Sequence, residues 1–509
     1  MLSLGVGTLV RVWNLHGARF VWPDEYRPLE PTLYSPFLFT AYWVPTLLFG
    51  ESQEVVLFMT ALLGVLSILM TFLLGQRLFD SRIGAHAAFL LSLFGLHVEL
   101  SRTGFAGVLE TVLILGAILA ISGSLFGTGL KNSSLLLAGG FLGLLFATHA
   151  GAYACIMAFV ILSALVWKQQ GRSFKKTMGG LVALGSGFLS VPVVVEIVSR
   201  VRVLVTSRGL SYSRYLWASG EASRSMLPVF DAGNFSSFVI FLKGLLVAGG
   251  TFQGVLVLAA TIFCGALVLL ERKRELTFVV GMVCLTYVIF CTLGYLCIHP
   301  NYPRYLVYLT PLLCLCMAYT LARAERRFGG GLVVVVLVVY AALSLPKVWE
   351  TISHTFKIEP ITQWLDRRKI PKERIATMLD LRENGVTGES TEVPGEKVDP
   401  PWGYYRIDWE RMKTLYEQGR IRFLMTSGLG TKSTVGYRDG ILASIKPLKT
   451  WAHPLRFRNP ENMVDSNRLP DEKVQDFSLY DLGDIFVEGA DRARDSGSTP
   501  RPPGDLPRE

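Results

Sequence analysis

Two adjacent carboxylates, Asp24 and Glu25, lie in the segment FVWPDEYRPLEPTLYSPFLFTAYWVP, just beyond an apolar run at the start of the chain. Arg27 and Glu30 follow them, and the tryptophan and proline before the pair would stiffen the segment. A carboxylate at a membrane surface can act as a general base towards a hydroxyl or an amine. The aromatic residues that follow suit a membrane interface. An ordinary solvated loop with surface acids is the alternative interpretation, because spacing alone does not separate the two.

A second polar group stands in the segment HVELSRTGFAGVLE, where Arg102 precedes Glu110 by about two helical turns. Glu110 lies inside an apolar run, and an acid at membrane depth is costly and usually functional. It could bind a ligand hydroxyl, pair with a basic residue or help to hold a metal. The alternatives are a structural ion pair for Glu110 and an interfacial position for Arg102, with its charged end in water.

Two further segments place polar side chains between apolar runs. ATHAGAY contains His149, and HPNYPRYLVYLTPLL contains His299, Tyr302 and Arg304. Each could contact a ligand at the same side of a membrane as the acidic pair. A buried histidine with its own hydrogen bonds fits the two histidines equally well.

A metal site is left unassigned. His97, Glu99 and Glu110 could gather around a divalent cation, but their spacing is not diagnostic of a metal. The seven cysteines all lie in apolar runs, where they are best interpreted as small side chains inside a helical bundle.

The composition predicts a polytopic membrane protein. Of the 509 residues, 51% are hydrophobic and 18% charged, against about 25% charged in soluble proteins, and the mean hydropathy is +0.40. A helix needs roughly 20 residues to cross a bilayer, and apolar runs of about this length recur up to residue 346. The short run 1–13 is expected to be a clipped first span that starts upstream, which makes about eleven spans. The others are expected near 55–78, 83–99, 105–127, 133–147, 149–167, 176–198, 246–270, 276–297, 303–322 and 329–346.

Alternate connectors between these runs are basic, and the positive-inside rule places such connectors in the cytoplasm. The basic residues concerned are Arg77, Arg82, Lys131, Lys168, Arg172, Lys175, Lys176, Arg272, Lys273, Arg274, Arg323, Arg326 and Arg327. The acidic first loop and, with an odd number of spans, the C-terminal part would then lie outside. The loop 200–224 carries five arginines and also falls outside. It is either an anion-binding surface or a sign of an error in this topology.

The chain from Lys347 onwards is polar and balanced in charge, with 26 basic and 26 acidic residues, so the whole net charge of +10 lies in residues 1–346. This argues against a nucleic-acid-binding tail and fits basic loops beside an anionic membrane. The C-terminal part predicts an α/β module with helices near 361–368 and 408–417 and strands near 374–379 and 421–426. We therefore expect a transmembrane catalytic domain in 1–346, a soluble extracytoplasmic α/β domain in 347–490 and a disordered tail in 491–509.

The motifs together resemble the GT-C glycosyltransferases. An acidic pair of the PDE type after a first span, followed by an aromatic interfacial segment, is similar to the first loop of that superfamily. HVELSRTGFAGVLE resembles its short outside turn, and the RY-x-x-x-x-x-P pattern of HPNYPRYLVYLTPLL resembles a late segment. The polar domain after the last span is also typical. Family 39 enzymes (the protein O-mannosyltransferases) and aminoarabinose transferases are the most similar, and the acidic pair is also similar to family 22 mannosyltransferases. The resemblance covers roughly residues 1–346.

This resemblance implies an integral membrane enzyme that takes a sugar from a polyprenyl-phosphate donor and passes it to a lipid, glycan or protein acceptor outside the cytoplasm. Asp24 would be the base of an inverting transfer, with Glu25 as the fallback. Arg102 and Arg304 would face the phosphate of the leaving group. The implied substrate contacts are Arg27, Glu30, Arg102, Glu110, His149, His299, Tyr302 and Arg304. The implied partners also include membrane lipids but no nucleic acid, and a bacterial inner (plasma) membrane is the default location.

Other functions compete with this interpretation. A transporter or a flippase for lipid-linked glycans would need polar residues deep in several spans, and the polar residues here gather mainly in the loops. The sequence contains no Walker A motif and no internal repeat. An oligosaccharyltransferase shares the GT-C architecture but carries a WWD-type motif that DPPWGYYRIDWE and KTWAHPLRF do not match. A structural assembly factor is the fourth alternative.

Overall fold

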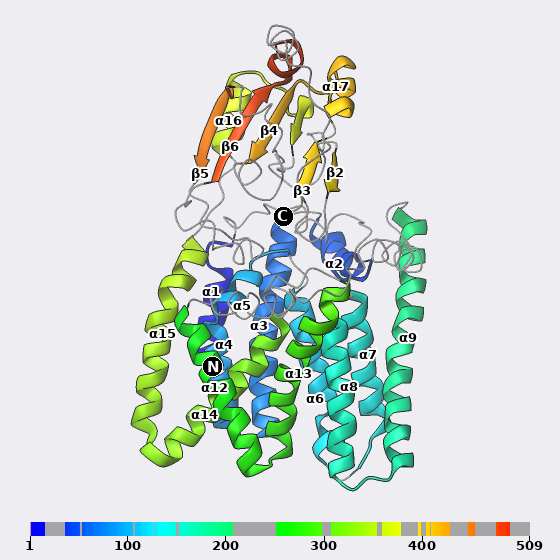
Figure 1. Cartoon of the computed structure of the whole chain (residues 1–509), viewed down its shortest axis with the longest axis vertical. Helices are drawn as coiled ribbons and strands as arrows, with labels where there is room; N and C mark the ends of the chain where they lie inside the picture. Colours follow the sequence, from blue (N-terminus) through cyan, green and yellow to red (C-terminus); the bar gives the residue numbers. More distant parts are fainter. Residues whose placement is uncertain are drawn as a thin grey trace, which may run out of the picture. The chain divides into compact units, whose positions relative to one another are not determined.

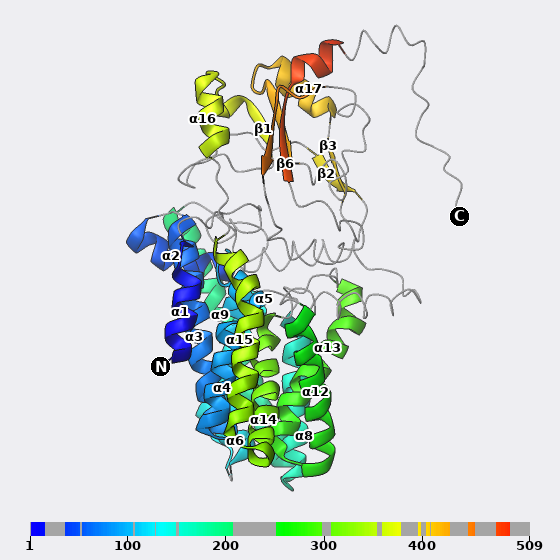
Figure 2. The ribbon, with the colours of Figure 1, turned by 90° about the vertical axis from the view of Figure 1, so that its left-hand side faces the viewer.

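The computed structural model describes most of the chain in two units (Figures 1 and 2). The first unit is helical and comprises the described residues up to 353, and the second comprises those from 359 onwards and contains both helices and strands. The described residues are 2–15, 36–50, 53–104, 107–127, 129–148, 152–206, 251–297, 307–353, 359–377, 395–398, 404–407, 409–427, 446–453 and 475–488.

The first unit is a bundle of membrane-type helices. Six of its described helices, α3, α6, α9, α12, α14 and α15, are long and apolar enough to cross a bilayer, and α1, α7 and α8 are shorter apolar helices. The predicted helical membrane bundle is therefore confirmed. The helices are α1 (Leu2–Val12), α2 (Pro36–Phe49), α3 (Gln53–Leu78), α4 (Ser81–Ser92), α5 (Gly95–Leu100), α6 (Gly107–Phe126), α7 (Asn132–Thr148), α8 (Tyr153–Gln169), α9 (Phe174–Thr206), α12 (Thr251–Glu271), α13 (Arg274–Cys297), α14 (Thr310–Phe328) and α15 (Gly330–Ser353).

Several of the expected spans differ in detail from the observed helices; α9, for example, continues to Thr206 and α14 to Phe328. The run 83–99 is divided, because α4 ends at Ser92 and α5 begins at Gly95. The run 329–346 continues through Pro346 to Ser353 as one helix. The division of the run 83–99 leaves backbone carbonyls inside the bundle that can accept hydrogen bonds from side chains of other helices.

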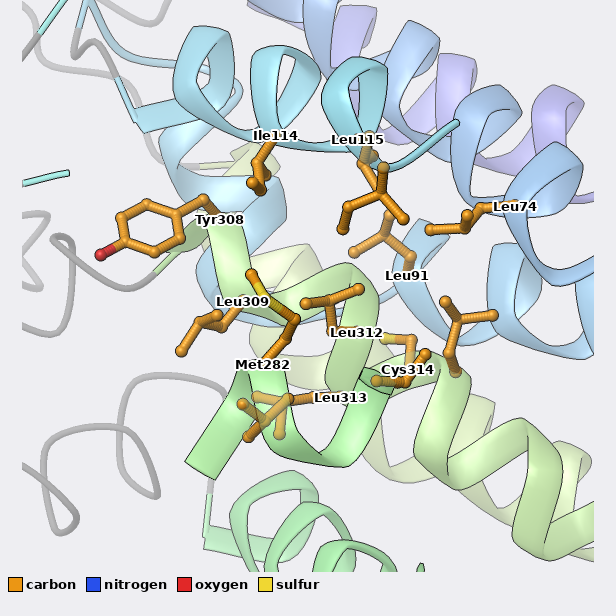
Figure 3. Close-up of a cluster of buried hydrophobic side chains, with 14 of the residues drawn as sticks. Leu74, Leu91, Ile114, Leu115, Met282, Tyr308, Leu309, Leu312, Leu313 and Cys314 are labelled. Atoms are coloured by element: carbon orange, nitrogen blue, oxygen red, sulfur yellow. The ribbon is translucent and has the colours of Figure 1, made fainter. Parts of the chain in front are cut away.

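The helices α6 and α14 form the centre of the bundle. Within their most apolar stretches 83% and 78% of the residues are buried, against 22% in α9 and in α15, which therefore lie at its periphery. Figure 3 shows the contact between α6 and α14, where Leu115 of α6 packs near Leu312 of α14 and Leu91 of α4. The peripheral helices carry many exposed leucine, isoleucine and valine side chains, as expected for surfaces that face lipid.

Glycines allow α7 and α9 to pack backbone against backbone. A Cβ atom on Gly139 of α7 would overlap the carbonyl oxygen of Leu184, and one on Gly187 of α9 would overlap that of Leu136. Small residues at such a crossing are typical of membrane helices, whose association depends on close packing.

We expect Gly139→Ala to destabilise the protein by about 1–3 kcal/mol, because the added methyl group must push the α9 backbone away. The midpoint of thermal unfolding in detergent would measure this. Gly140→Ala is the matched control, because a Cβ atom at Gly140 meets nothing within 4 Å. Equal midpoints for the two variants would show that the α7–α9 contact does not require glycine.

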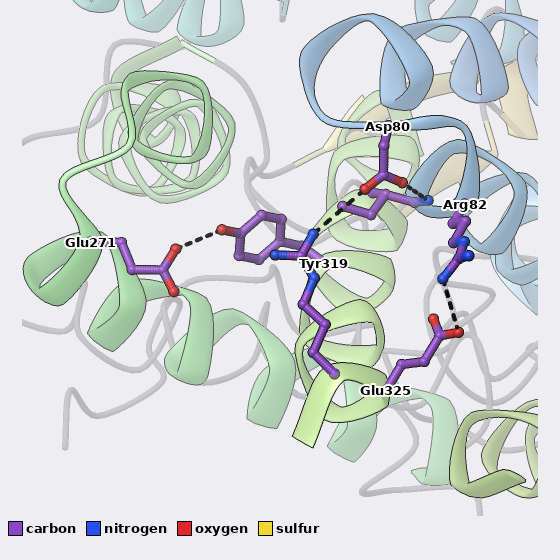
Figure 4. A network of polar contacts seen from close by, with 7 residues as sticks. Asp80, Arg82, Glu271, Tyr319 and Glu325 are labelled. Carbon is purple, nitrogen blue, oxygen red and sulfur yellow. Dashed lines mark hydrogen bonds and ion pairs between the residues drawn. The ribbon is translucent and has the colours of Figure 1, made fainter. Parts of the chain in front are cut away.

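Charged side chains tie several helices together at one end of the bundle (Figure 4). Asp80 caps α4 by accepting a hydrogen bond from the amide of Ile83 at 2.8 Å, and Arg326 lies 3.8 Å from the same carboxylate. Arg82 and Glu325 form a second ion pair at 3.4 Å. These contacts join the connector between α3 and α4 to the last turn of α14.

A second set of contacts extends the same end to α12 and α8. The hydroxyl of Tyr319 donates to Glu271 at 2.7 Å, and Arg323 pairs with the same carboxylate. Arg172, after α8, donates to the carbonyl of Ser124 near the end of α6 at 3.0 Å. The five basic connectors identified in the sequence therefore meet at one end of the bundle, which we call the basic end.

The second unit contains a small mixed sheet. Its four strands have the order β1-β4-β6-β5; β1 and β4 are parallel, and the other neighbours are antiparallel. A separate antiparallel pair is formed by β2 and β3. The predicted combination of helices and strands is confirmed. The elements are α16 (Glu359–Arg367), β1 (Ile375–Thr377), β2 (Gly395–Val398), β3 (Tyr404–Ile407), α17 (Trp409–Glu417), β4 (Phe423–Ser427), β5 (Lys449–His453) and β6 (Gln475–Asp481).

The core of this second unit lies between α17 and one face of the sheet. Met412 of α17 is fully buried and packs in one cluster with Leu424 of β4 and Tyr480 of β6. Ile421 and Leu482, just outside the strands, complete it. The predicted tail 491–509 lies outside the described residues.

Candidate functional site

Two of the site residues predicted from the sequence, Arg102 and Glu110, belong to the described part of the chain. Arg102 follows the end of α5 and Glu110 lies in the first turn of α6, and both are buried, with 1% and 3% of their surface exposed. The remaining predicted site residues lie outside the described residues and stay predictions. These are Asp24, Glu25, Arg27, Glu30, His149, His299, Tyr302 and Arg304.

The side chain of Arg102 closes the C-terminal end of α1. Its guanidinium donates hydrogen bonds to the carbonyl oxygens of Val10 at 3.3 Å, Arg11 at 2.9 Å, Trp13 at 2.7 Å and Asn14 at 3.2 Å. The last carbonyls of a helix lack partners within the helix and carry partial negative charge, so a buried cation is favourable here. Arg102 therefore anchors the point from which the chain continues towards the acidic pair. Its predicted contact with a phosphate stays a prediction.

The break between α4 and α5 is held by side chains from distant helices. The hydroxyl of Tyr340 on α15 donates to the carbonyl of Leu90 at 2.9 Å. Gln253 on α12 donates to the carbonyl of Leu93 at 2.8 Å and accepts from the amide of Gly95 at 3.0 Å. These hydrogen bonds replace the helical hydrogen bonds that the break removes, and they fix the direction of α5 relative to α4.

Arg11 on α1 is the fully buried centre of a polar network that sequence reasoning missed. A guanidinium has five N–H groups, and each has an acceptor here. Nε donates to Ser101 Oγ at 3.2 Å, Nη1 to the carbonyls of Gly7 at 3.1 Å and Ser92 at 3.2 Å, and Nη2 to the carbonyl of Leu91 at 3.3 Å and to His97 Nδ1 at 2.8 Å. Arg11 thus has a structural role and no N–H group left for a ligand.

The network assigns the protonation of His97. Arginine can only donate, so Nδ1 of His97 must accept, and the ring is neutral with its proton on Nε2. Nε2 then donates to Ser67 Oγ at 3.0 Å, and Ser67 donates to the carbonyl of Gly64 at 2.7 Å. With both ring nitrogens engaged, His97 is not available as a metal ligand in this arrangement. Among the described residues, no three histidine, cysteine, aspartate or glutamate side chains gather as a metal site.

Glu110 lies among hydroxyl and thiol groups near the start of α6. It interacts electrostatically with Tyr308, in the turn before α14, and with Cys155 on α8. Tyr153, in the first turn of α8, interacts with the same tyrosine. The sequence offered a signal for both tyrosines, since each lies four residues after a predicted site residue, His149 or Arg304.

Comparison with known proteins gives one family match. Residues 33–195 match the family described as dolichyl-phosphate-mannose-protein mannosyltransferases. This stretch contains Arg102, Glu110 and His149. No curated protein matches the chain in sequence.

Two solved structures resemble the chain in fold. ArnT from Cupriavidus metallidurans, crystallised in the apo state, is similar over 94% of this chain and 96% of its own, with a TM-score of 0.52 and 13% sequence identity. The oligosaccharyltransferase of Archaeoglobus fulgidus is similar over 84% of this chain and 68% of its own, with a TM-score of 0.50 and 13% identity.

The helical bundle, the second unit with its sheet and these likenesses define a class, the polytopic membrane proteins with the GT-C fold. The chain thus has the GT-C fold, and its residues 33–195 match a family of mannosyltransferases, as the resemblance of its motifs predicted.

Proposed function

We propose that this protein transfers a sugar from a polyprenyl-phosphate donor to a lipid, glycan or protein acceptor. The observation that carries the proposal is the match of residues 33–195, since that family is named for enzymes that use a mannose carried on dolichyl phosphate. A lipid-borne donor also gives a reason for a membrane bundle, because its apolar chain stays in the bilayer while the sugar reaches the polar ends of the helices.

In the proposed reaction, Asp24 removes the proton of the acceptor hydroxyl or amine. The acceptor atom attacks the anomeric carbon from the side opposite the phosphate, the bond from that carbon to the phosphate oxygen breaks, and polyprenyl phosphate leaves. One carboxylate is sufficient for such an inversion, which leaves Glu25 as the fallback base. The result is a transferred sugar of inverted configuration.

The leaving phosphate needs cationic partners as its charge develops. We assign the main contact to Arg304, because Arg102 already donates four hydrogen bonds to the end of α1. Arg102 would then contribute through its charge. The remaining proposed substrate contacts are Arg27, Glu30, Glu110, His149, His299 and Tyr302.

The proposed location is a bacterial inner (plasma) membrane, with the reaction and the second unit outside the cytoplasm. The support is the gathering of the basic connectors at one end of the bundle, which the positive-inside rule assigns to the cytoplasm. In this proposed topology the segments with the predicted site residues would lie at the other end.

The proposal is tested with purified protein in liposomes and radiolabelled sugars on polyprenyl phosphates. We expect time-dependent formation of a glycosylated acceptor together with free polyprenyl phosphate. Parallel reactions with a chelator, and with magnesium or manganese restored, decide whether a divalent cation takes part. Movement of the labelled lipid across the bilayer without transfer from any donor would contradict the proposal and favour a flippase.

A further inference from the structure

Tyr308 has a hydroxyl group that no described residue satisfies. Its side chain is fully buried, and its hydroxyl has no hydrogen-bond partner among the described residues. Most buried polar groups in folded proteins are paired, because a buried hydroxyl without a partner costs stability. A phenylalanine would fill the same space without that cost. We therefore expect the hydroxyl to serve the function of the protein and not its stability.

The position of Tyr308 points to a ligand. In Figure 3 the ring of Tyr308 lies at the edge of the apolar cluster, near Leu309 and Ile114. Its hydroxyl points away from the leucine side chains. Its electrostatic partners, Glu110 and Tyr153, belong to the first turns of α6 and α8. The starts of these helices and of α14 lie at the end of the bundle opposite the basic end, since their other ends take part in the basic end.

The chemistry of this group favours a sugar ring. A carboxylate accepts hydrogen bonds from the hydroxyls of a sugar, and the phenol of a tyrosine can donate or accept one. An ionised carboxylate at Glu110 would repel a phosphate, so we assign the phosphate to another part of the site. The arrangement therefore suits the neutral, hydroxyl-rich part of a lipid-linked sugar and not its phosphate.

We propose that Tyr308 is a specificity-determining residue whose hydroxyl bonds one hydroxyl of the donor sugar, beside Glu110 and Tyr153. The inference rests on the proposed function and deepens it, since it names the part of the donor that this group recognises. The bound sugar would supply the partner that the hydroxyl lacks among the described residues.

The first test compares Tyr308→Phe with a matched control, Tyr340→Phe. Tyr340 is equally buried, but its hydroxyl bonds the carbonyl of Leu90 at 2.9 Å and lies 3.3 Å from Gln253 Nε2. We expect Tyr308→Phe to lower kcat/KM for transfer about tenfold at an unchanged or higher Tm, since one neutral hydrogen bond is lost only with the ligand. Tyr340→Phe should lower the Tm and leave the choice of donor unchanged.

The second test uses polyprenyl-phosphate donors that each lack one sugar hydroxyl. For one of these deoxy donors, Tyr308→Phe and the wild type should have the same kcat/KM, while they differ about tenfold with the intact sugar. A tenfold loss that is equal for all donors, or no loss for any, would overturn the inference while leaving the proposed function intact. A wild type that is inactive with every donor would instead overturn the proposed function and this inference with it.

Discussion

The Asp24→Asn variant is expected to transfer sugar about 10³-fold more slowly than the wild type, at an equal protein level in the membrane. An asparagine has nearly the shape of the aspartate but cannot take the acceptor proton, and the loss of a positioned general base typically costs 10²–10⁴-fold in rate. The measurement is the initial rate of transfer from a radiolabelled polyprenyl-phosphate sugar under saturating donor. Because the substitution keeps the size of the side chain, the Tm should stay the same.

The adjacent carboxylate provides the control for this prediction. Glu25→Gln makes the same change of charge one residue further on, and we expect it to retain most of the activity. If Glu25→Gln abolished transfer and Asp24→Asn did not, the base would be Glu25. Equal, nearly complete activity in both variants would remove the acidic pair from the chemistry.

The second large effect is expected in stability. Arg11→Leu removes five hydrogen-bond donors from the interior and leaves His97 Nδ1 and four oxygen atoms without this partner. At about 1–3 kcal/mol for each buried group left unsatisfied, the loss should reach several kcal/mol even where some carbonyls keep a helical bond. We expect low yield of folded protein and a clearly lower Tm in detergent.

Two further variants define the limits of this result. Arg11→Lys keeps the charge but has three donors instead of five, so its Tm should fall between those of the wild type and Arg11→Leu. Arg82→Leu removes an arginine whose side chain is 75% exposed and whose ion pair with Glu325 contributes at most about 1 kcal/mol. An Arg11→Leu variant no less stable than Arg82→Leu would contradict the structural role of the network.

Much of the helical bundle was predictable because lipid imposes a simple rule on the sequence. A segment that crosses a bilayer must satisfy its own backbone and present apolar side chains, so long apolar runs reveal helices such as α3 and α6 directly. The break at Leu93 was not predictable, since the run is apolar throughout. It depends on donors from Tyr340 and Gln253, which lie more than 150 residues away in the sequence.

The candidate site was predictable in its residue types and only partly in its geometry. An acid in an apolar helix identified Glu110, and the structure adds Tyr308, which interacts with both Glu110 and Tyr153. The phosphate contact of Arg102 stays a prediction, and the structure adds that its guanidinium donates to the carbonyls of α1. An arginine carries the same signature in sequence whether it binds a ligand or a helix end, because both offer negative charge and oxygen acceptors.

The ion pairs at the basic end have a mechanical consequence. Charges clamp α4, α12 and α14 together at that end, whereas along most of their length these helices meet through apolar side chains, such as those of Figure 3. Lipid tails are as apolar as leucine and can replace such contacts at little cost. At the far end of α4, Gln253 also ties α12 to Leu93 and Gly95. A long-chain lipid would therefore separate α14 from α4 more easily than it would separate α12 from α4, and it would do so away from the basic end.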